Sequence, residues 1–102
     1  MTNEQFLSEV EKAYLRSVTI LQKKEKEYSN GRDRLEQFHR AASLQRILPT
    51  EALMGMATKH ITSIADMCKE PENHTIKQWH EKLDDLRNYT FLLDALLTYV
   101  RG

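Results

Sequence analysis

The C-terminal stretch, residues 75–101, is predicted to form one long helix with two different faces. One face carries an apolar stripe at the three- and four-residue spacing of a helix seam: Ile76, Trp79, Leu83, Leu86, Thr90, Leu93, Leu97 and Val100. The opposite face begins with Glu81, Asp85 and Asn88 and ends with Leu92, Ala95 or Leu96, and Tyr99. A solvated face has no reason to become apolar along its length. We therefore expect both faces to meet protein and the acidic residues to line a crevice.

The rest of the chain also reads as helical, because no stretch alternates apolar and polar residues as a strand would. Turn signals at residues 29–32, around Leu48 and Pro49, and at residues 71–74 divide it into helices over residues 3–27, 33–46, 49–69 and 75–101. Four helices joined by short turns predict an all-α, up-and-down four-helix bundle. We expect a single helical domain over residues 1–102.

Local signals mark where these helices begin and which faces they bury. Thr2 with Gln5 and Thr75 with Gln78 fit the capping box, while Asp33 and Thr50 are predicted N-caps. Three buried stripes follow from the helical periodicity: Phe6, Val10, Tyr14, Val18 and Leu21 in the first helix; Leu35, Phe38, Ala41 or Ala42, and Leu44 or Gln45 in the second; and Leu53, Ala57, Ile61, Ile64 and Cys68 in the third.

Charge and apolar content exclude several classes of function. Lys plus Arg equals Asp plus Glu at 15 each, so no net field attracts nucleic acid or an anionic membrane. No apolar run approaches the roughly 20 residues of a membrane span, and the N-terminus lacks the pattern of an export signal. We expect a cytoplasmic protein whose lone Cys68 is a buried, inert thiol.

A homodimer is expected, because several large apolar residues lie off the main seam of the last helix in a chain too short to bury them all. These residues are Phe91, Leu92, Leu96 and Tyr99.

Oxygen ligands lie on one side of the last helix. Glu81 and Asp85 are four residues apart and Asn88 follows three later, so all three point the same way from a helix. Two oxygen ligands on adjacent turns are enough for a Mg²⁺ ion that keeps several of its waters. The alternative is an ordinary charged surface.

In the third helix, Gly55 beside Lys59 and near other small residues predicts open space next to charged groups. The lysines of residues 23–27 either reach a phosphate or form a solvated helix end. The four histidines lack zinc-ligand spacing.

Three segments carry a family pattern: Tyr28-Ser29-x-Gly31-x-Asp33-Arg34-Leu35-x-x-Phe38-x-x-Ala41-Ala42; Ala52-Leu53-x-Gly55-Met56-x-x-Lys59-His60-x-x-Ser63-x-x-Asp66-Met67; and Trp79-x-Glu81-Lys82-x-x-Asp85-x-x-Asn88-Tyr89. Together they resemble the nucleotide-modification-associated domain family, short proteins carried widely by phages and prophages. The all-α fold of that family is similar to that of the MazG-type nucleoside triphosphate pyrophosphatases. The resemblance covers most of the chain.

This resemblance implies Mg²⁺-dependent handling of a nucleotide, such as hydrolysis of an NTP or dNTP to the monophosphate and pyrophosphate. The residues that match metal-binding and catalytic positions are Glu81, Asp85 and Asp66. Those expected to contact the phosphates or the nucleotide are Lys59, Ser63, Asn88, Tyr28 and Arg34.

The chain departs from the MazG-type pattern of Glu-x-x-Glu on one helix and Glu/Asp-x-x-Asp on the next. The third helix offers Lys59, Ser63 and Asp66 where two glutamates are expected, and Lys82 stands three residues before Asp85. Nucleotide binding without hydrolysis therefore stays open beside pyrophosphatase activity.

In two other interpretations the protein neither binds a nucleotide nor catalyses a reaction. In the first, the chain is a non-enzymatic phage interaction protein that inhibits or recruits a host protein, such as a defence nuclease. In the second, it is a structural dimeric bundle with a polar crevice of no chemical meaning. None of the three interpretations involves direct contact with nucleic acid or a membrane.

Overall fold

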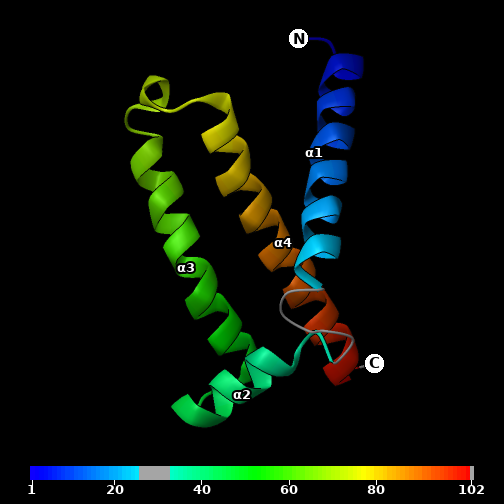
Figure 1. The fold of residues 1–102 in the computed structure, drawn as a ribbon, viewed down its shortest axis with the longest axis vertical. Coiled ribbons are helices and arrows are strands. Elements are labelled where there is room, and N and C mark those ends of the chain that lie inside the picture. The colour runs from blue at the N-terminus through cyan, green and yellow to red at the C-terminus, as the bar shows by residue number, and fades with distance from the viewer. Residues whose placement is uncertain (26–32, 102) are drawn as a thin grey trace.

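The computed structural model describes residues 1–25 and 33–101. Its α-helices are α1 (Asn3–Lys24), α2 (Glu36–Gln45), α3 (Pro49–Met67) and α4 (Ile76–Arg101), and a 3-10 helix η2 (Pro71–Asn73) joins α3 to α4. The predicted all-α helical bundle is confirmed, and the described part of the chain contains no strand. In Figure 1, α1 and α4 run in the same direction, α3 runs opposite to both, and the short α2 lies at the base of α3.

Two of the four predicted caps are present. Thr2 Oγ1 accepts a hydrogen bond from the Gln5 N–H at 3.1 Å, and the Gln5 side chain accepts one from the Thr2 N–H at 2.7 Å. The same reciprocal pair joins Thr75 and Gln78, at 3.1 and 2.9 Å. Each pair satisfies two N–H groups that the first turn of a helix leaves without partners. These starts are therefore fixed by residues that are local in the sequence.

The other two starts differ from the prediction. Helix α2 begins at Glu36, and Asp33 instead accepts a hydrogen bond from the Leu35 N–H at 2.9 Å, forming a turn before the helix. Helix α3 begins at Pro49 with Leu48 as its N-cap, so Thr50 already lies inside the helix. Proline is favoured in the first helical turn because its missing N–H would have no partner there.

The core lies where α2, α3 and α4 meet. Leu35, Phe38, Leu53 and Leu96 are buried together, and Met56, Tyr89, Leu92 and Leu93 pack against them. On α4 the most buried side chains are Asp84, Asn88 and Leu96, at helical spacing. Asn88 and Leu96 belong to the second face predicted for α4, so this part of the face meets protein as expected, whereas Glu81 and Tyr99 at its two ends are exposed. The stripe predicted as the main seam is less buried, and Ile76 and Leu97 are exposed.

Several predicted core residues are exposed. Helix α1 packs on α4 only through its second half, so Ser17 is buried while Phe6, Val10 and Tyr14 are about half exposed. On α3 and α2 the predictions hold for Leu53, Ala57, Phe38 and Ala42. They are wrong for Ile61, Leu44, Gln45 and Cys68, which are exposed. None of the described helices combines the length and the hydropathy needed to cross a membrane.

Candidate ligand-binding pocket

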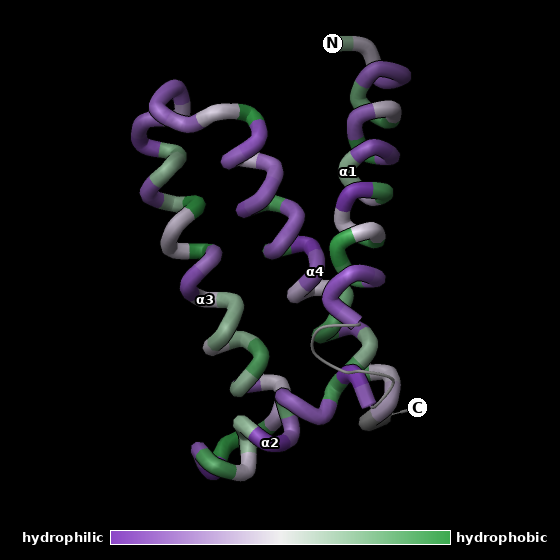
Figure 2. The backbone as a smooth tube through the Cα atoms, viewed as in Figure 1, coloured by the Kyte–Doolittle hydropathy of each residue, from purple (hydrophilic) through white to green (hydrophobic). Residues whose placement is uncertain are grey.

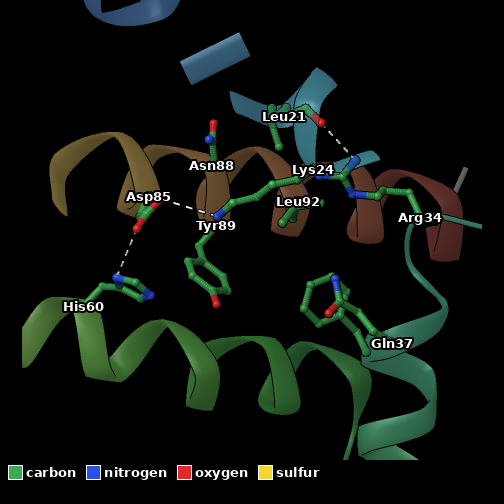
Figure 3. Close-up of a pocket in the computed structure, with 10 residues that line it drawn as sticks. Leu21, Lys24, Arg34, Gln37, His60, Asp85, Asn88, Tyr89 and Leu92 are labelled. Atoms are coloured by element: carbon green, nitrogen blue, oxygen red, sulfur yellow. Dashed lines mark hydrogen bonds and ion pairs between the residues drawn. The ribbon is translucent and has the colours of Figure 1, made fainter. Parts of the chain in front are cut away.

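A cavity of about 250 Å³ lies between α3 and α4 and is bordered by the start of α2 and the end of α1. Its wall is mixed, with aromatic and aliphatic side chains beside charged and amide groups (Figure 3). The residues that line it are Leu21, Lys24, Arg34, Gln37, Phe38, His60, Asp85, Asn88, Tyr89 and Leu92. A pocket with convergent polar groups on an apolar base is the usual form of a small-molecule site.

Asp85 lies between a lysine and a histidine from different helices. Its carboxylate is 3.6 Å from Lys24 Nζ on α1 and 3.9 Å from His60 Nδ1 on α3. Figure 3 shows His60 pointing up from α3 and Lys24 reaching across from α1 to the same carboxylate. Both separations exceed a normal hydrogen-bond length, so both contacts are loose. His60 Nδ1 is buried and has no hydrogen-bond partner among the described residues.

Arg34 closes the end of the pocket near α2. Its Nη1 donates a hydrogen bond to the Leu21 carbonyl oxygen at 3.1 Å, which ties the residues before α2 to the last turn of α1. Its Nε is buried and makes no hydrogen bond to any residue the structure describes. A guanidinium carries five N–H donors in a planar fork. This arginine is therefore held in position by one hydrogen bond and keeps other N–H groups that can donate to a ligand.

Asn88 is held on the buried face of α4. Its Nδ2 donates to the Ser17 carbonyl oxygen at 3.2 Å, so it connects α4 to α1 at the rim of the pocket. Its Oδ1 is buried and accepts no hydrogen bond within residues 1–25 and 33–101. A buried acceptor of this kind costs free energy unless water or a ligand supplies a donor.

Aromatic rings form the apolar wall of the pocket. The rings of His60 and Tyr89 lie 5.1 Å apart at an angle of 43°, and Phe38 is buried beside them. In Figure 3 the Tyr89 ring points from α4 toward α3, between His60 and Gln37. A planar ligand ring fits this kind of surface, because stacking on aromatic side chains does not depend on hydrogen-bond geometry.

The predicted carboxylate cluster is not assembled. Asp85 lines the pocket, but Glu81 is exposed. The Asp66 side chain is 70% exposed and pairs with Lys69 on its own helix. Across the described part of the chain, no three His, Cys, Asp or Glu side chains form a group that could hold a metal ion. The arrangement of these residues thus does not fit a resident metal held by the three predicted carboxylates.

Of the predicted nucleotide-contacting residues, Arg34 and Asn88 line the pocket. Lys59 lines a neighbouring groove with Ala52 and Gly55, and His60 and Tyr89 belong to the walls of both. The open space predicted beside Gly55 is present, since a Cβ atom at this position would have no heavy atom within 4 Å. Ser63 is half-buried and lines neither hollow. Tyr28 lies outside the described residues.

Three pocket residues were not singled out from the sequence. Tyr89 follows Asp85 by four residues, so helical periodicity alone could have placed it on the same face. His60 was considered only as one of the four histidines that lack zinc-ligand spacing. No sequence pattern indicated that Gln37 lines a pocket, because its position there depends on how α2 meets α4. Lys24 was considered only as one of the lysines able to reach a phosphate.

Comparison with known proteins gives no match for this chain among family models, curated proteins or solved structures.

Proposed function

We propose that this protein binds a nucleotide in the pocket between α3 and α4. The observation that carries the proposal is the convergence of Lys24 and Arg34, from two separate segments, on a cavity that also contains Tyr89 and Asp85. Cationic side chains and aromatic rings in one pocket match the phosphates and the base of a nucleotide. The resemblance of the sequence to nucleotide-handling families supports the same ligand class.

The phosphates would contact Lys24 and Arg34. Arginine recognises phosphate through paired N–H donors, and lysine acts as a mobile point charge. The Leu21 carbonyl fixes one edge of the Arg34 guanidinium, which leaves the remaining donors oriented in advance. The Lys24 ion pair with Asp85 is long and partly exposed, so a phosphate could replace the carboxylate at small cost.

The base would lie against Tyr89 and His60. Their tilted pair of rings offers faces on which a base could stack, and the Gln37 amide offers hydrogen bonds to the edge of the base. The cavity of about 250 Å³ is smaller than the roughly 300–1,000 Å³ of typical ligand sites. Part of the nucleotide would therefore extend into the groove that contains Lys59, which shares two wall residues with the pocket.

Magnesium enters this proposal with the nucleotide. Mg²⁺ keeps several waters and is commonly bound by one or two carboxylates together with substrate phosphates. Asp85 is the carboxylate that lines the pocket and would meet such an ion. The proposal is therefore binding of the free or magnesium-bound nucleotide. Pyrophosphate release is the separate assay that would extend it to hydrolysis.

Thermal melting tests the proposal directly, because a ligand that binds only the folded state raises the melting temperature. The panel consists of ribo- and deoxyribonucleoside mono- and triphosphates, each with and without Mg²⁺. We expect at least one nucleotide to raise the melting temperature, and inorganic phosphate to have a smaller effect. Absence of a shift with every nucleotide, at millimolar concentration, would reject the proposal.

Neighbouring lysines provide a matched pair of variants. Lys24 lines the pocket, whereas Lys23 is exposed on the adjacent position of α1. Lys24→Gln should reduce the nucleotide-induced shift, measured against the variant's own melting temperature without ligand, and Lys23→Gln should leave it unchanged. Equal losses in the two variants would point to general charge attraction in place of a defined site.

A further inference from the structure

Buried apolar and buried polar side chains lie in different parts of the fold. In the described part of the chain, the buried apolar residues belong to α2, α3, α4 and the turn before α2, and none belongs to α1. The buried polar residues are Ser17 on α1 and Asp84 and Asn88 on α4. In Figure 1, α4 lies between α1 and α3, and Figure 2 shows hydrophilic positions recurring along the whole of α1. Helix α1 therefore lies outside the apolar core and is attached to one side of α4.

Hydrogen bonds between polar groups join α1 to α4. Arg16 Nε donates to Asp84 Oδ2 at 3.1 Å, and Arg87 Nε donates to Ser17 Oγ at 3.2 Å. Asn88 Nδ2 donates to the Ser17 carbonyl oxygen at 3.2 Å. Because such bonds replace hydrogen bonds to water, their net contribution to stability is modest. The apolar side chains in the second half of α1 stay partly or largely exposed. We therefore expect α1 to be held less firmly than α2, α3 and α4 hold one another.

The cationic part of the pocket between α3 and α4 depends on α1. Lys24 lies in the last turn of α1, and Arg34 is held by its 3.1 Å hydrogen bond to the carbonyl oxygen of Leu21, also on α1. The aromatic residues of the pocket belong to α2, α3 and α4. Movement of α1 away from α4 would therefore displace both cations and leave the aromatic wall in place.

We propose that α1 docks on the rest of the fold as a separate unit, and that nucleotide binding and the docking of α1 stabilise each other. A ligand whose site is complete in only one of two conformations raises the population of that conformation. Lys24 and Arg34 reach a phosphate together only when α1 lies on α4, so the bound nucleotide holds α1 in place. This coupling rests on the nucleotide site proposed above, whereas separate docking rests on the contacts between α1 and α4.

Arg16 allows the docking of α1 to be weakened without a change in the pocket. It precedes Lys24 by eight residues, about 12 Å along the helix, and it does not line the pocket. Arg16→Met removes the hydrogen bond to Asp84 but leaves that carboxylate paired with Arg87. Lys12→Met is the matched control, because it removes the same charge about one turn earlier, from an exposed lysine that pairs within α1.

Hydrogen exchange of the free protein tests whether α1 docks separately, because each amide exchanges through the local opening that exposes it. We expect amides of residues 13–24 to exchange at least about tenfold faster than those of α3 around Leu53 and Ala57. Arg16→Met should accelerate exchange in residues 13–24 by a further factor of about ten and leave α3 unchanged, and Lys12→Met should change neither helix. Equal rates in the two helices of the wild type would overturn separate docking, as would an Arg16→Met variant that accelerates both helices equally or neither.

Hydrogen exchange with bound nucleotide tests the coupling. The ligand is the nucleotide that raises the melting temperature most, at about 100 times its dissociation constant, and it should slow exchange in residues 13–24 by up to about 100-fold. A nucleotide that raises the melting temperature but leaves this exchange unchanged would overturn the coupling and leave the nucleotide site standing. If no nucleotide raises the melting temperature, the coupling is rejected with the proposed function, and the exchange rates of the free protein still decide whether α1 docks separately.

Discussion

The Lys24 Nζ atom lies 3.6 Å from Asp85 Oδ1, and this ion pair links the last turn of α1 to the middle of α4 beside the pocket. The two side chains are 40% and 28% exposed, so solvent screens the pair. It therefore contributes little to the free energy of unfolding, up to about 1 kcal/mol. A bound phosphate would therefore compete with Asp85 for the same ammonium group.

Removing this competition should change binding in opposite directions with and without magnesium. In Asp85→Asn, we expect metal-free nucleotide to bind up to about fivefold more tightly, because Lys24 no longer has to leave a carboxylate. With Mg²⁺ present the variant should bind more weakly than the wild type, because the ion loses a ligand. Titration calorimetry in EDTA and in Mg²⁺ checks both. A variant that matches the wild type under both conditions would exclude Asp85 from the site.

The contact between α1 and α4 should depend on Asp84. This carboxylate is buried, accepts a hydrogen bond from Arg16 Nε at 3.1 Å, and is bound by Arg87 on its own helix. Arg87 also donates to Ser17 Oγ at 3.2 Å. Asp84→Ala should lower the free energy of unfolding by about 1–3 kcal/mol, a range reduced because both arginines are about one-third exposed and can be hydrated.

Asp66→Ala is the control for that experiment. Its ion pair with Lys69 joins two largely exposed side chains on one helix, so chemical denaturation should show a change below about 0.5 kcal/mol. Equal losses for the two aspartates would mean that the buried network contributes no more than a surface pair.

Packing in the core should be tested with two leucines. Leu53 is 1% exposed within the cluster formed by α2, α3 and α4, whereas Leu44 on α2 is 81% exposed. We expect Leu53→Ala to reduce the free energy of unfolding by about 2–5 kcal/mol, from lost burial and the cavity left behind. Leu44→Ala should change it by less than about 0.5 kcal/mol. Urea unfolding measures both, and a small loss at Leu53 would contradict the assignment of the core.

Gly55→Ala separates two explanations for a glycine inside α3. The added methyl group meets no atom within 4 Å, so the variant should be more stable by about 0.5–1 kcal/mol because alanine favours the helix. If the groove beside Lys59 receives part of the nucleotide, this variant should also bind it more weakly. Stabilisation with unchanged affinity would confine the ligand to the pocket between α3 and α4.

Sequence reasoning succeeded where the signal was local. The Thr2–Gln5 and Thr75–Gln78 caps join residues three apart, and helical spacing placed Asp85 and Asn88 near one another. It failed where position depends on how helices meet. Periodicity showed that Phe6, Val10 and Tyr14 share a face, but it did not show that α4 covers only the second half of α1. Spacing also could not show that Asp66 is largely exposed and pairs with Lys69 on its own helix.

The pocket residues illustrate the same limit. Asp85 was identified because it lies among oxygen ligands on one helix. Its partners Lys24 and His60 come from two other helices, and no sequence spacing relates positions so far apart. The arginine that closes the pocket was expected to approach the ligand through the family resemblance, and the structure places Arg34 on its wall.

Nuclear magnetic resonance mapping of a nucleotide titration tests the central claim most directly. Backbone amide signals are followed as a nucleoside triphosphate is added to the isotopically labelled protein with Mg²⁺. We predict the largest changes at His60, Asp85 and Tyr89, with little change at Phe6 or Leu44. Changes that cluster away from the pocket, or no changes at saturating nucleotide, would contradict the assignment of this pocket as a nucleotide site.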